Sequence, residues 1–462
     1  MFSAGKLAAA VALLLLALAA TAVHGCQVSP PPGLRWAWVG GVTDTSAVLV
    51  AELHDPDQYR HLRLTLTTPD GTTRNLRPDP PAGTRGQIAR FQLTDLTPAT
   101  LYQWRLGFVA PPPATTPNPA PRAGRFHTFP APGTPTAFTF ALGACMRTGT
   151  ESPVFAHIAR YRPAFFLHMG DLHYEDIADN DPARFEAAVA TQLSGPALRP
   201  LLETTPIAYV WDDHDFGPND SDSTSPSKAA SAAAYRTLVP HYDLHDDTAV
   251  YQAFTVGRVR FVLADLRSQR LRPAQRPSPG SDETPTAVGT MLSERQLEWL
   301  KSELLAASRS HAVVFFVSTV PWIDSGSSRD SWNGYRTQRR HLAEFFRDHG
   351  ITNLAILSGD AHMLALDDGT HSSFTLPPSP PGPVVFHAGA LDQRESVKGG
   401  PYTYGPHPGP HQFGLVTVLD DGRDVQVVFA GMKADRADAN PAELFRFTWT
   451  PTPPQGPPAR PD

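Results

Sequence analysis

YVWDDHDFGPND, residues 209–220, joins an apolar run to a cluster of acids around one histidine. The apolar residues 207–210 predict a buried strand, and the acids with His214 come directly after it. Open α/β sheets hold their ligand sites at the carboxyl ends of their strands. By itself the segment is equally compatible with a solvated acidic turn, so its meaning depends on the rest of the chain.

Two further segments repeat this arrangement. FFLHMGD at residues 165–171 and LAILSGDAH at residues 354–362 each place Gly-Asp after an apolar strand, with a histidine two residues beyond the Asp. Carboxylate and imidazole groups are ligands of hard and borderline cations. Three such junctions in one chain are hard to explain as solvated loops, and we interpret them as parts of one polynuclear metal site.

The composition places the chain among globular proteins. With 462 residues, 41% hydrophobic and 18% charged, it is long enough for two or three domains. A formal net charge of -6 gives no general attraction to nucleic acids or anionic membranes, so we expect no specific nucleic-acid recognition. Proline-rich stretches at 110–121, 376–383 and 450–462 are typical of stiff linkers, loops and tails.

Residues 1–26 have the pattern of an export signal. Lys6 precedes an apolar run, residues 7–20, that is short for a membrane span. Ala-Thr-Ala at 20–22 offers a cleavage site, and Cys26 offers an alternative, a lipoprotein signal whose acylated cysteine anchors the protein to a membrane. Both predict an exported protein in the periplasm, outside the cell or on its surface. Cys145 stands alone in the body of the chain, so no intrachain disulfide is expected.

Residues 28–130 have the pattern of an all-β domain. Apolar and polar residues alternate in 47–53 and 62–67, and Pro-Asp-Gly at 69–71 marks a turn between strands. LTDLTPATLYQWRL, residues 93–106, resembles the end of a fibronectin type III or immunoglobulin-like sandwich, in which a Tyr follows a turn and starts a strand. We expect a packing or lid domain, since this segment contains no cluster of titratable groups.

Residues 136–435 change to strands that alternate with helices, followed by a run of strands. Helices are expected at 152–161, 182–194, 228–238, 292–307 and 337–349. Ser152 is the expected N-cap of the first, and Ser293 with Gln296 forms the pattern of a capping box at another. This order predicts an α+β fold in which two sheets pack between helices, the αββα sandwich.

Four motifs follow one another in the chain. They are Gly170-Asp171 with Tyr174, Trp211-Asp212-Asp213-His214, Asp265-x-Arg267-x-x-Arg270, and Ser358-Gly359-Asp360-x-His362. Each is weak alone, but the ordered set resembles the alkaline phosphatase D (PhoD-like) family of the calcineurin-like metallophosphoesterases. The resemblance spans residues 28–435. It implies a multinuclear centre, with iron and calcium in some members, and hydrolysis of phosphate mono- and diesters outside the cytoplasm.

The resemblance also implies a set of metal ligands: Cys145, Asp171, Tyr174, Asp213, Asp360 and His362. Asp171 corresponds to the carboxylate that bridges two metals. A phenolate from Tyr174 suits a ferric ion, and a thiolate from Cys145 favours a softer or redox-active metal over calcium. We expect two or three ions, with Fe³⁺ and Ca²⁺ as the candidates. Such ions generate hydroxide at neutral pH and hold the oxygens of the phosphate ester that it attacks.

Three further residues are candidates for catalysis. His214 is a candidate general acid for the leaving alkoxide or a phosphate contact, with a core histidine as the alternative. Arg267 and Arg270 follow a predicted strand, where guanidinium groups can grip phosphate, with a surface arginine pair as the alternative. The neighbouring polar residues either complete a calcium site or cap the turn; they are Asp212, Asp215, Asn219 and Asp220.

Three functions are compatible with these observations. The first is a secreted, metal-dependent phosphatase, and the second is a phosphodiesterase or phospholipase D-like enzyme, since only the shape of the pocket separates the two. The third is a cell-surface binding protein with structural metals, which the β domain and the proline-rich tail would suit. Cys145, Tyr174 and the two arginines argue against it, because a structural calcium site needs none of them. We expect a monomer that acts on phosphate mono- or diesters.

Overall fold

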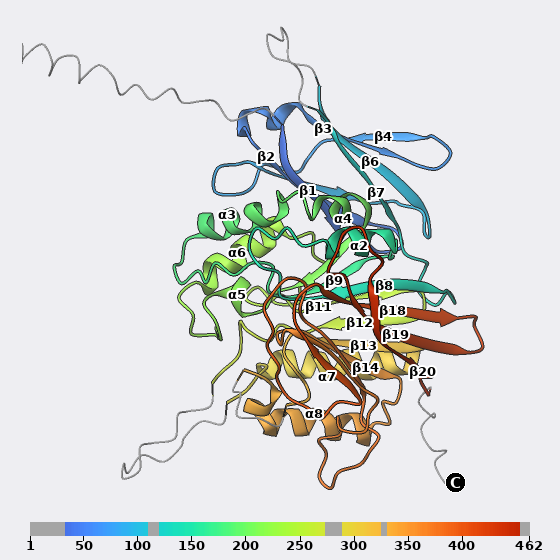
Figure 1. The fold of residues 1–462 in the computed structure, drawn as a ribbon. Coiled ribbons are helices and arrows are strands. Elements are labelled where there is room, and N and C mark those ends of the chain that lie inside the picture. The colour runs from blue at the N-terminus through green and yellow to red at the C-terminus, as the bar shows by residue number, and fades with distance from the viewer. Residues whose placement is uncertain (1–32, 110–119, 273–288, 325–329, 453–462) are drawn as a thin grey trace, which may run out of the picture.

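The computed structural model describes residues 33–109, 120–272, 289–324 and 330–452 (Figure 1). The predicted signal with Cys26 lies outside the described residues, as does the predicted tail beyond Thr452. Within the described ranges, no helix combines the length and the apolarity that a membrane span requires.

The N-terminal region is built from antiparallel strands in two sheets. Its elements are β1 (Leu34–Gly40), β2 (Ala47–Leu53), the 3-10 helix η1 (Pro56–His61), β3 (Leu62–Thr67), β4 (Thr73–Leu76), β5 (Ile88–Leu93), β6 (Leu101–Phe108) and β7 (Arg122–His127). Four of these strands form a separate sheet in the order β4-β3-β6-β7. Strands β1, β2 and β5 instead extend a much larger sheet, which the sequence did not predict.

Gly40 makes this extension possible. It pairs in parallel with Ile207 at the start of β10 (Ile207–Val210). A Cβ atom at Gly40 would lie 2.3 Å from the carbonyl oxygen of Ile207 and 2.7 Å from that of Pro240, so a larger residue could not approach as closely. The N-terminal strands are therefore joined to β10 through backbone pairing as well as through side-chain packing.

The larger sheet has nine strands in the order β20-β19-β18-β8-β9-β10-β1-β2-β5. Its remaining members are β8 (Phe138–Gly143), β9 (Phe166–Met169), β18 (Gln412–Asp420), β19 (Val425–Lys433) and β20 (Ala442–Trp449). Strands β8, β9 and β10 run parallel, so their carboxyl ends meet at one edge. That edge carries the first two strand-to-acid junctions that the sequence singled out.

A second sheet has seven strands in the order β11-β12-β13-β14-β16-β15-β17. They are β11 (Gln252–Val256), β12 (Val259–Leu263), β13 (Val313–Ser318), β14 (Leu354–Ser358), β15 (Met363–Asp367), β16 (Val384–Ala388) and β17 (Tyr404–Pro408). The central strands β12, β13, β14 and β16 are parallel. Every residue of β13 and β14 is buried, because this sheet is covered on both faces.

Helices cover the outer faces of the two sheets (Figure 1). On the side of the nine-stranded sheet lie α2 (Val154–Arg160), α3 (Pro182–Leu193), α4 (Arg199–Thr204), α5 (Asp213–Phe216) and α6 (Lys228–Leu238). On the other side lie α7 (Glu294–Ser310) and α8 (Arg336–Asp348), and the 3-10 helix η2 (Trp332–Tyr335) directly precedes α8 in the chain. Between the sheets, the rings of Phe140, Phe165 and Phe261 pack with centroids 5.1–5.2 Å apart. The mixed α+β sandwich expected from the sequence is confirmed.

The capping of two helices differs in part from the sequence expectation. The first helix begins at Val154 with Pro153 as its N-cap, one residue after the expected cap. At α7, Ser293 caps the backbone N–H of Gln296 as predicted, but the reciprocal half of the capping box is absent among its described contacts. The Gln296 side chain instead binds the backbone of Asp265, accepting from its N–H at 2.8 Å and donating to its C=O at 3.0 Å. Gln296 is fully buried, so it serves to tie α7 to the end of β12.

Candidate metal centre

Three of the candidate ligands occupy equivalent backbone positions. Cys145, Asp171 and Asp360 are each the second residue after a strand, following β8, β9 and β14. All three have a left-handed backbone, with φ of 63°, 57° and 68°. Residues other than glycine seldom adopt this conformation, and where they do it often accompanies a functional site. The three side chains therefore leave their strand ends in the same way, from two different sheets.

Glycines allow these junctions to approach one another. A Cβ atom at Gly170 would lie 2.3 Å from the Cβ of Asp212, and one at Gly359 would lie 2.9 Å from the Cβ of Ala144. Either contact is closer than packed carbon atoms tolerate. The Gly-Asp pairs in the sequence thus have a steric reason, since the glycine lets the following aspartate come close to the neighbouring strand end.

Direct contacts link five of the predicted ligands. The hydroxyl of Tyr174 donates to Oδ2 of Asp171 at 2.8 Å and lies 3.1 Å from Nε2 of His362. Sγ of Cys145 lies 3.5 Å from the same Asp171 oxygen and 3.4 Å from the carbonyl oxygen of Asp360. Donor atoms of Asp213 fall within 4.8 Å of both Asp171 and Asp360. The structure thus brings all six predicted ligands together, and we call these six residues the ligand cluster.

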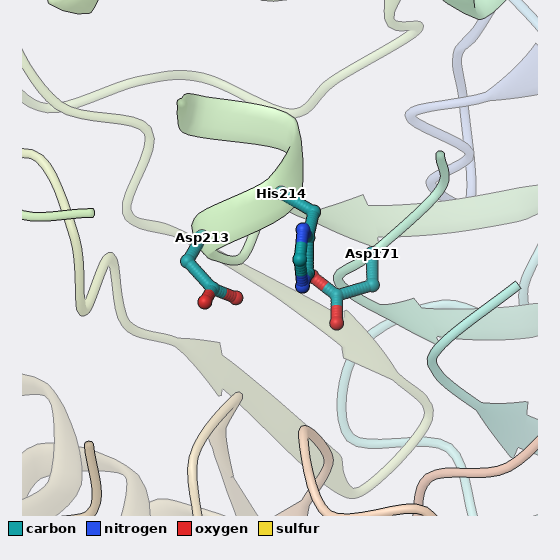
Figure 2. Close-up of side chains that lie close together, drawn as sticks. All are labelled: Asp171, Asp213 and His214. Atoms are coloured by element: carbon teal, nitrogen blue, oxygen red, sulfur yellow. The ribbon is translucent and has the colours of Figure 1, made fainter. Parts of the chain in front are cut away.

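Figure 2 shows the centre of this arrangement, where Asp171, Asp213 and His214 lie side by side. The cluster opens onto a cavity of about 360 Å³. The cavity is lined by Asp171, His214, Asn219, Asp220, Asp330, Asp360, His362, Ser396 and Lys398. Cys145 is completely buried beneath this surface.

Two oxygen atoms of the cluster have no hydrogen-bond partner among the described residues. They are Oδ1 of Asp171 and Oδ1 of Asp213, and both are buried. Oδ1 of Asp213 lies 3.4 Å from a guanidinium nitrogen of Arg267, which is an ion-pair contact without a hydrogen bond. A buried carboxylate oxygen without a partner is unfavourable. A bound cation would supply the missing interaction, so the residues present fit a metal centre.

The pKa shifts of three residues in the cluster also agree with a metal centre. Burial raises the pKa of Asp171 well above its usual value, and the neighbouring carboxylates of Asp213 and Asp212 raise it further. Burial likewise raises the pKa of the Cys145 thiol and of the Tyr174 phenol, and Asp171 adds to both. These groups resist ionisation because negative charge accumulates in a buried space. Metal cations reverse that balance and allow thiolate, phenolate and carboxylate to form together.

His362 has one ring nitrogen available as a metal ligand. Burial lowers its pKa to about 4, so the ring is neutral at physiological pH. Its Nδ1 lies 2.5 Å from the carbonyl oxygen of Arg394, and a carbonyl can only accept, so Nδ1 carries the proton. Nε2 therefore has a free lone pair directed toward Tyr174 and the ligand cluster. Histidines that bind metals commonly have their second nitrogen fixed in this way.

His214 is held over the cavity by two contacts. Its Nδ1 lies 2.6 Å from Oδ1 of Asp176, and its ring packs on Tyr174 with centroids 4.0 Å apart. The contact with Asp176 occupies Nδ1, which leaves Nε2 as the ring nitrogen available to act in the cavity that His214 lines. The sequence analysis did not identify Asp176.

The structure does not bring Arg267 and Arg270 to the cavity as phosphate contacts. Arg267 is fully buried and forms ion pairs at 2.6 Å with both Asp212 and Asp330. Arg270 is 2% exposed, pairs with Asp330 at 2.6 Å and donates to the hydroxyl of Tyr335 at the same distance. We call Asp212, Asp330, Arg267 and Arg270 the arginine wall. These guanidinium groups neutralise buried carboxylates behind the ligand cluster, because they follow β12 into the interior rather than into the cavity.

Several residues at the site have roles that the sequence left open. Asp215 accepts hydrogen bonds from the backbone N–H groups of Asp171, Leu172 and Asp212 at 2.6–2.9 Å, so it pins the ends of β9 and β10 together. This favours the capping alternative for Asp215 over a calcium ligand. Asp220 lines the cavity, and one of its oxygens falls within 4.8 Å of oxygens of Asp213 and Asp330.

Asp330 and Lys398 belong to the site but were not identified from the sequence. Nζ of Lys398 contacts both carboxylate oxygens of Asp360, at 2.9 and 2.6 Å, and lies 3.6 Å from Asp330. Burial alone would lower the pKa of Lys398, but Asp360 and Asp330 more than offset this, so the pKa lies above its usual value. Neither residue stands next to a predicted strand, and the sequence therefore carried no positional signal for them.

Comparison with known proteins agrees with this geometry. A model of the PhoD-like phosphatase family matches residues 140–397. The chain is 27% identical over 283 residues to alkaline phosphatase D of Bacillus subtilis (strain 168), covering 52% of this chain and 48% of that protein. It therefore spans about half the length of this curated relative.

Two solved structures share the fold. One is a structure of PhoD, with a TM-score of 0.67 and 18% identity over 92% of this chain and 91% of the other. The second is a purple acid phosphatase isolated from yellow lupin (Lupinus luteus) seeds, with a TM-score of 0.62 and 12% identity over 91% of this chain and 74% of the other. Because the family model covers more than half of the sequence, the chain belongs to the PhoD-like phosphatase family.

Proposed function

We propose that the protein is an exported, metal-dependent hydrolase of phosphoric esters. The observation that carries this proposal is the unpartnered Oδ1 of Asp171, a residue that lines a cavity, contacts a thiol and a phenol through its other oxygen, and lies beside the carboxylate of Asp213 and the imidazole of His214. An acidic turn whose carboxylates are all hydrogen-bonded has no buried oxygen without a partner. Membership of the family supports the phosphate ester as substrate.

The ligand cluster divides by chemistry into two parts. Cys145 and Tyr174 touch one oxygen of Asp171 and are suited to a ferric or other redox-active ion. Asp213 and Asp360 offer oxygen ligands that suit calcium, and Asp171 stands between the two parts as the proposed bridge. Cations bound there would polarise phosphoryl oxygens and lower the pKa of water. Fe³⁺ and Ca²⁺ are therefore our proposed metals.

His214 is the proposed proton donor to the leaving alkoxide. It lines the cavity, and Asp176 holds its Nδ1, so that Nε2 is the ring nitrogen available to transfer the proton. We propose that Arg267 and Arg270 act on catalysis through the carboxylates that they hold, as positioning residues. Their burial in ion pairs supports this role over direct contact with phosphate.

The organisation of the whole chain is also a proposal. Residues 1–26 would form the export signal, with Cys26 as the alternative lipid anchor, and residues 450–462 would form a tail. Residues 28–130 would be a fibronectin III or Ig-like domain, supported by the two sheets to which its strands contribute. Residues 136–435 would be the catalytic domain of a monomer. A binding protein with only structural metals is disfavoured, because the thiol of Cys145 and the open cavity have no place in it.

The test is to measure metals and activity on the same purified protein. Elemental analysis should find two or three equivalents of metal. The protein should hydrolyse p-nitrophenyl phosphate or bis(p-nitrophenyl) phosphate, and the faster of the two decides between monoesterase and diesterase. Exhaustive chelation should abolish this activity and adding back the same metals should restore it. A protein that carries no metal, or that hydrolyses neither ester when loaded, would disprove the proposal.

A further inference from the structure

Lys398 is the one permanently charged cation among the described residues that line the cavity. The two arginines of the site are committed to the arginine wall. A phosphate ester entering the cavity would therefore meet carboxylates, two histidines, an asparagine, a serine and this single ammonium group. Phosphoryl oxygens in enzymes are commonly held by lysine as a point charge.

The loop around Lys398 is fixed on both sides, so the residue is placed rather than freely mobile. On one side, the backbone N–H of Ser396 donates to the carbonyl of His362 at 3.4 Å. On the other, the hydroxyl of Tyr402 lies 3.1 Å from the carbonyl of Lys398. Gly399 has a φ of 78°, and a Cβ atom there would lie 2.0 Å from the carbonyl oxygen of Ile323, so the residue after Lys398 must be glycine. The backbone therefore keeps the lysine at the cavity while its side chain can change partners.

The present partner of Lys398 is a residue that the metal centre would require. Both oxygens of Asp360 contact Nζ, at 2.9 and 2.6 Å. A cation that binds Asp360 would weaken these contacts, because the ammonium group and the cation carry like charges at one carboxylate and repel each other. Asp330, whose nearest oxygen is 3.6 Å away, keeps the ammonium within the cavity after that exchange.

We propose that Lys398 is a substrate-binding residue, which pairs with Asp360 in the metal-free protein and contacts the phosphoryl oxygens when cations are bound to Asp360. This inference rests on the proposed function, since it assumes cations at Asp360 and a phosphate ester in the cavity. It assigns to Lys398 the phosphate contact that the sequence assigned to Arg267 and Arg270. It also predicts two effects of opposite sign, because the ammonium group competes with the metal and attracts the phosphate.

The experiment replaces Lys398 with Met and measures two equilibria that do not depend on turnover. Inorganic phosphate is titrated into the as-purified protein by calorimetry, and metal content is measured after dialysis. Phosphate affinity should fall roughly 10- to 100-fold, the range expected for one charge-assisted hydrogen bond. Metal content should equal or exceed that of the wild type. Lys301→Met is the matched control, because Lys301 is 25% exposed against 24% for Lys398 and lies on α7 away from the cavity.

The outcomes separate this inference from the proposed function. If the wild type carries metal and hydrolyses an ester but Lys398→Met binds phosphate as tightly as the wild type, the inference alone is wrong. If Lys398→Met loses its metal, Lys398 supports the metal centre and the inference is also wrong. If the wild type carries no metal and is inactive, both the inference and the proposed function are wrong. Lys398→Gln, which keeps a donor toward Asp360 but not the charge, decides the question should the Met variant fail to fold.

Discussion

The ligand cluster and the arginine wall are adjacent, buried and rich in aspartate, yet they differ in how their oxygens are satisfied. In the wall, Asp212 accepts from Arg267 at 2.6 and 2.9 Å and from the hydroxyl of Thr319 at 2.7 Å. In the cluster, Oδ1 of Asp171 has no partner within the described structure. The aspartate of the wall is therefore satisfied by neighbouring protein groups, whereas the aspartate of the cluster has an oxygen available to a cation.

The difference shows which property marks a ligand. Burial does not, because Asp212 and Asp171 are 0% and 1% exposed. Proximity in sequence does not either, because Asp212 belongs to the wall and Asp213 to the cluster. What distinguishes Asp171 from Asp212 is an unfilled hydrogen-bonding capacity beside a cavity, which a cation can complete. The predictions below test this criterion, beginning with the residue that meets it most fully.

Asp171→Asn should have the largest effect. The substitution removes the charge that would hold two cations together, so metal content should fall and turnover should drop at least 10²-fold, a loss of more than about 3 kcal/mol in transition-state stabilisation. The metal-free variant should be no less stable than the metal-free wild type, because burial already opposes ionisation of Asp171. Elemental analysis, ester hydrolysis and urea unfolding measure the three quantities.

Asp246→Asn is the control for this prediction. Asp246 is also buried, but its Oδ1 accepts from both the backbone N–H and the hydroxyl of Thr248 at 2.7 Å, and it does not line the cavity. Its substitution should leave metal content unchanged. Should Asp171→Asn retain full metal and activity, Asp171 would have only a structural role and the criterion would fail at its strongest example.

Arg267→Met should mainly lower the stability of the protein, rather than its affinity for phosphate. It leaves Asp212 and Asp330 buried with much of their charge uncompensated, which costs roughly 3–5 kcal/mol of unfolding free energy. Urea unfolding measures this loss, and Arg260→Met, which breaks a half-buried pair with Glu303, should cost no more than about 1 kcal/mol. If Arg267→Met instead keeps its stability and binds phosphate more weakly, the result would support the direct phosphate contact that the sequence suggested.

The sequence predicted the junctions well because they depend on local pattern. An apolar strand that ends in Gly-Asp is visible in the chain, and parallel strands place their carboxyl ends at one edge. The proximity of Asp171 and Asp213 follows from that rule, whereas Asp360 comes from the other sheet and joins them through the packing of the two sheets. The same rule could not tell that Arg267 turns inward, because a guanidinium that follows a strand looks alike in sequence whether it meets phosphate or carboxylate.

What the sequence missed depends on contacts between distant segments. Lys398 reaches Asp360 from an irregular loop, and Asp176 reaches His214 across 38 residues. Neither position carries a periodic or turn pattern that would place its side chain. The joining of β1 to β10 was missed for the same reason, since it rests on one backbone pairing at Gly40.

His168 tests whether an unpartnered polar atom is sufficient to mark a functional residue. Both of its ring nitrogens lack hydrogen-bond partners among the described residues, yet it is 2% exposed and does not line the cavity. Its ring packs edge-on against Phe166 and Tyr209, with centroids 5.9 and 5.5 Å away. By the criterion above it is a core residue, because no ligand can reach it.

The pH dependence of stability distinguishes the two roles, and its effect at neutral pH is the smallest of the three. Burial lowers the pKa of His168 to about 3, against 6.5 for a free histidine. Between these two pH values, the unfolded chain binds a proton at this residue that the folded protein does not. The free energy of unfolding is therefore unaffected by this residue above pH 6.5 and falls by about 1.4 kcal/mol per pH unit below it. In metal-free protein, His168→Leu should therefore gain about 2 kcal/mol relative to the wild type between pH 7.5 and pH 5.0, measured by urea unfolding. Exposed His349→Leu should show no comparable gain. If His168→Leu follows the wild-type dependence, the folded protein binds a proton at His168, and the ring has a partner that marks it as more than a core side chain.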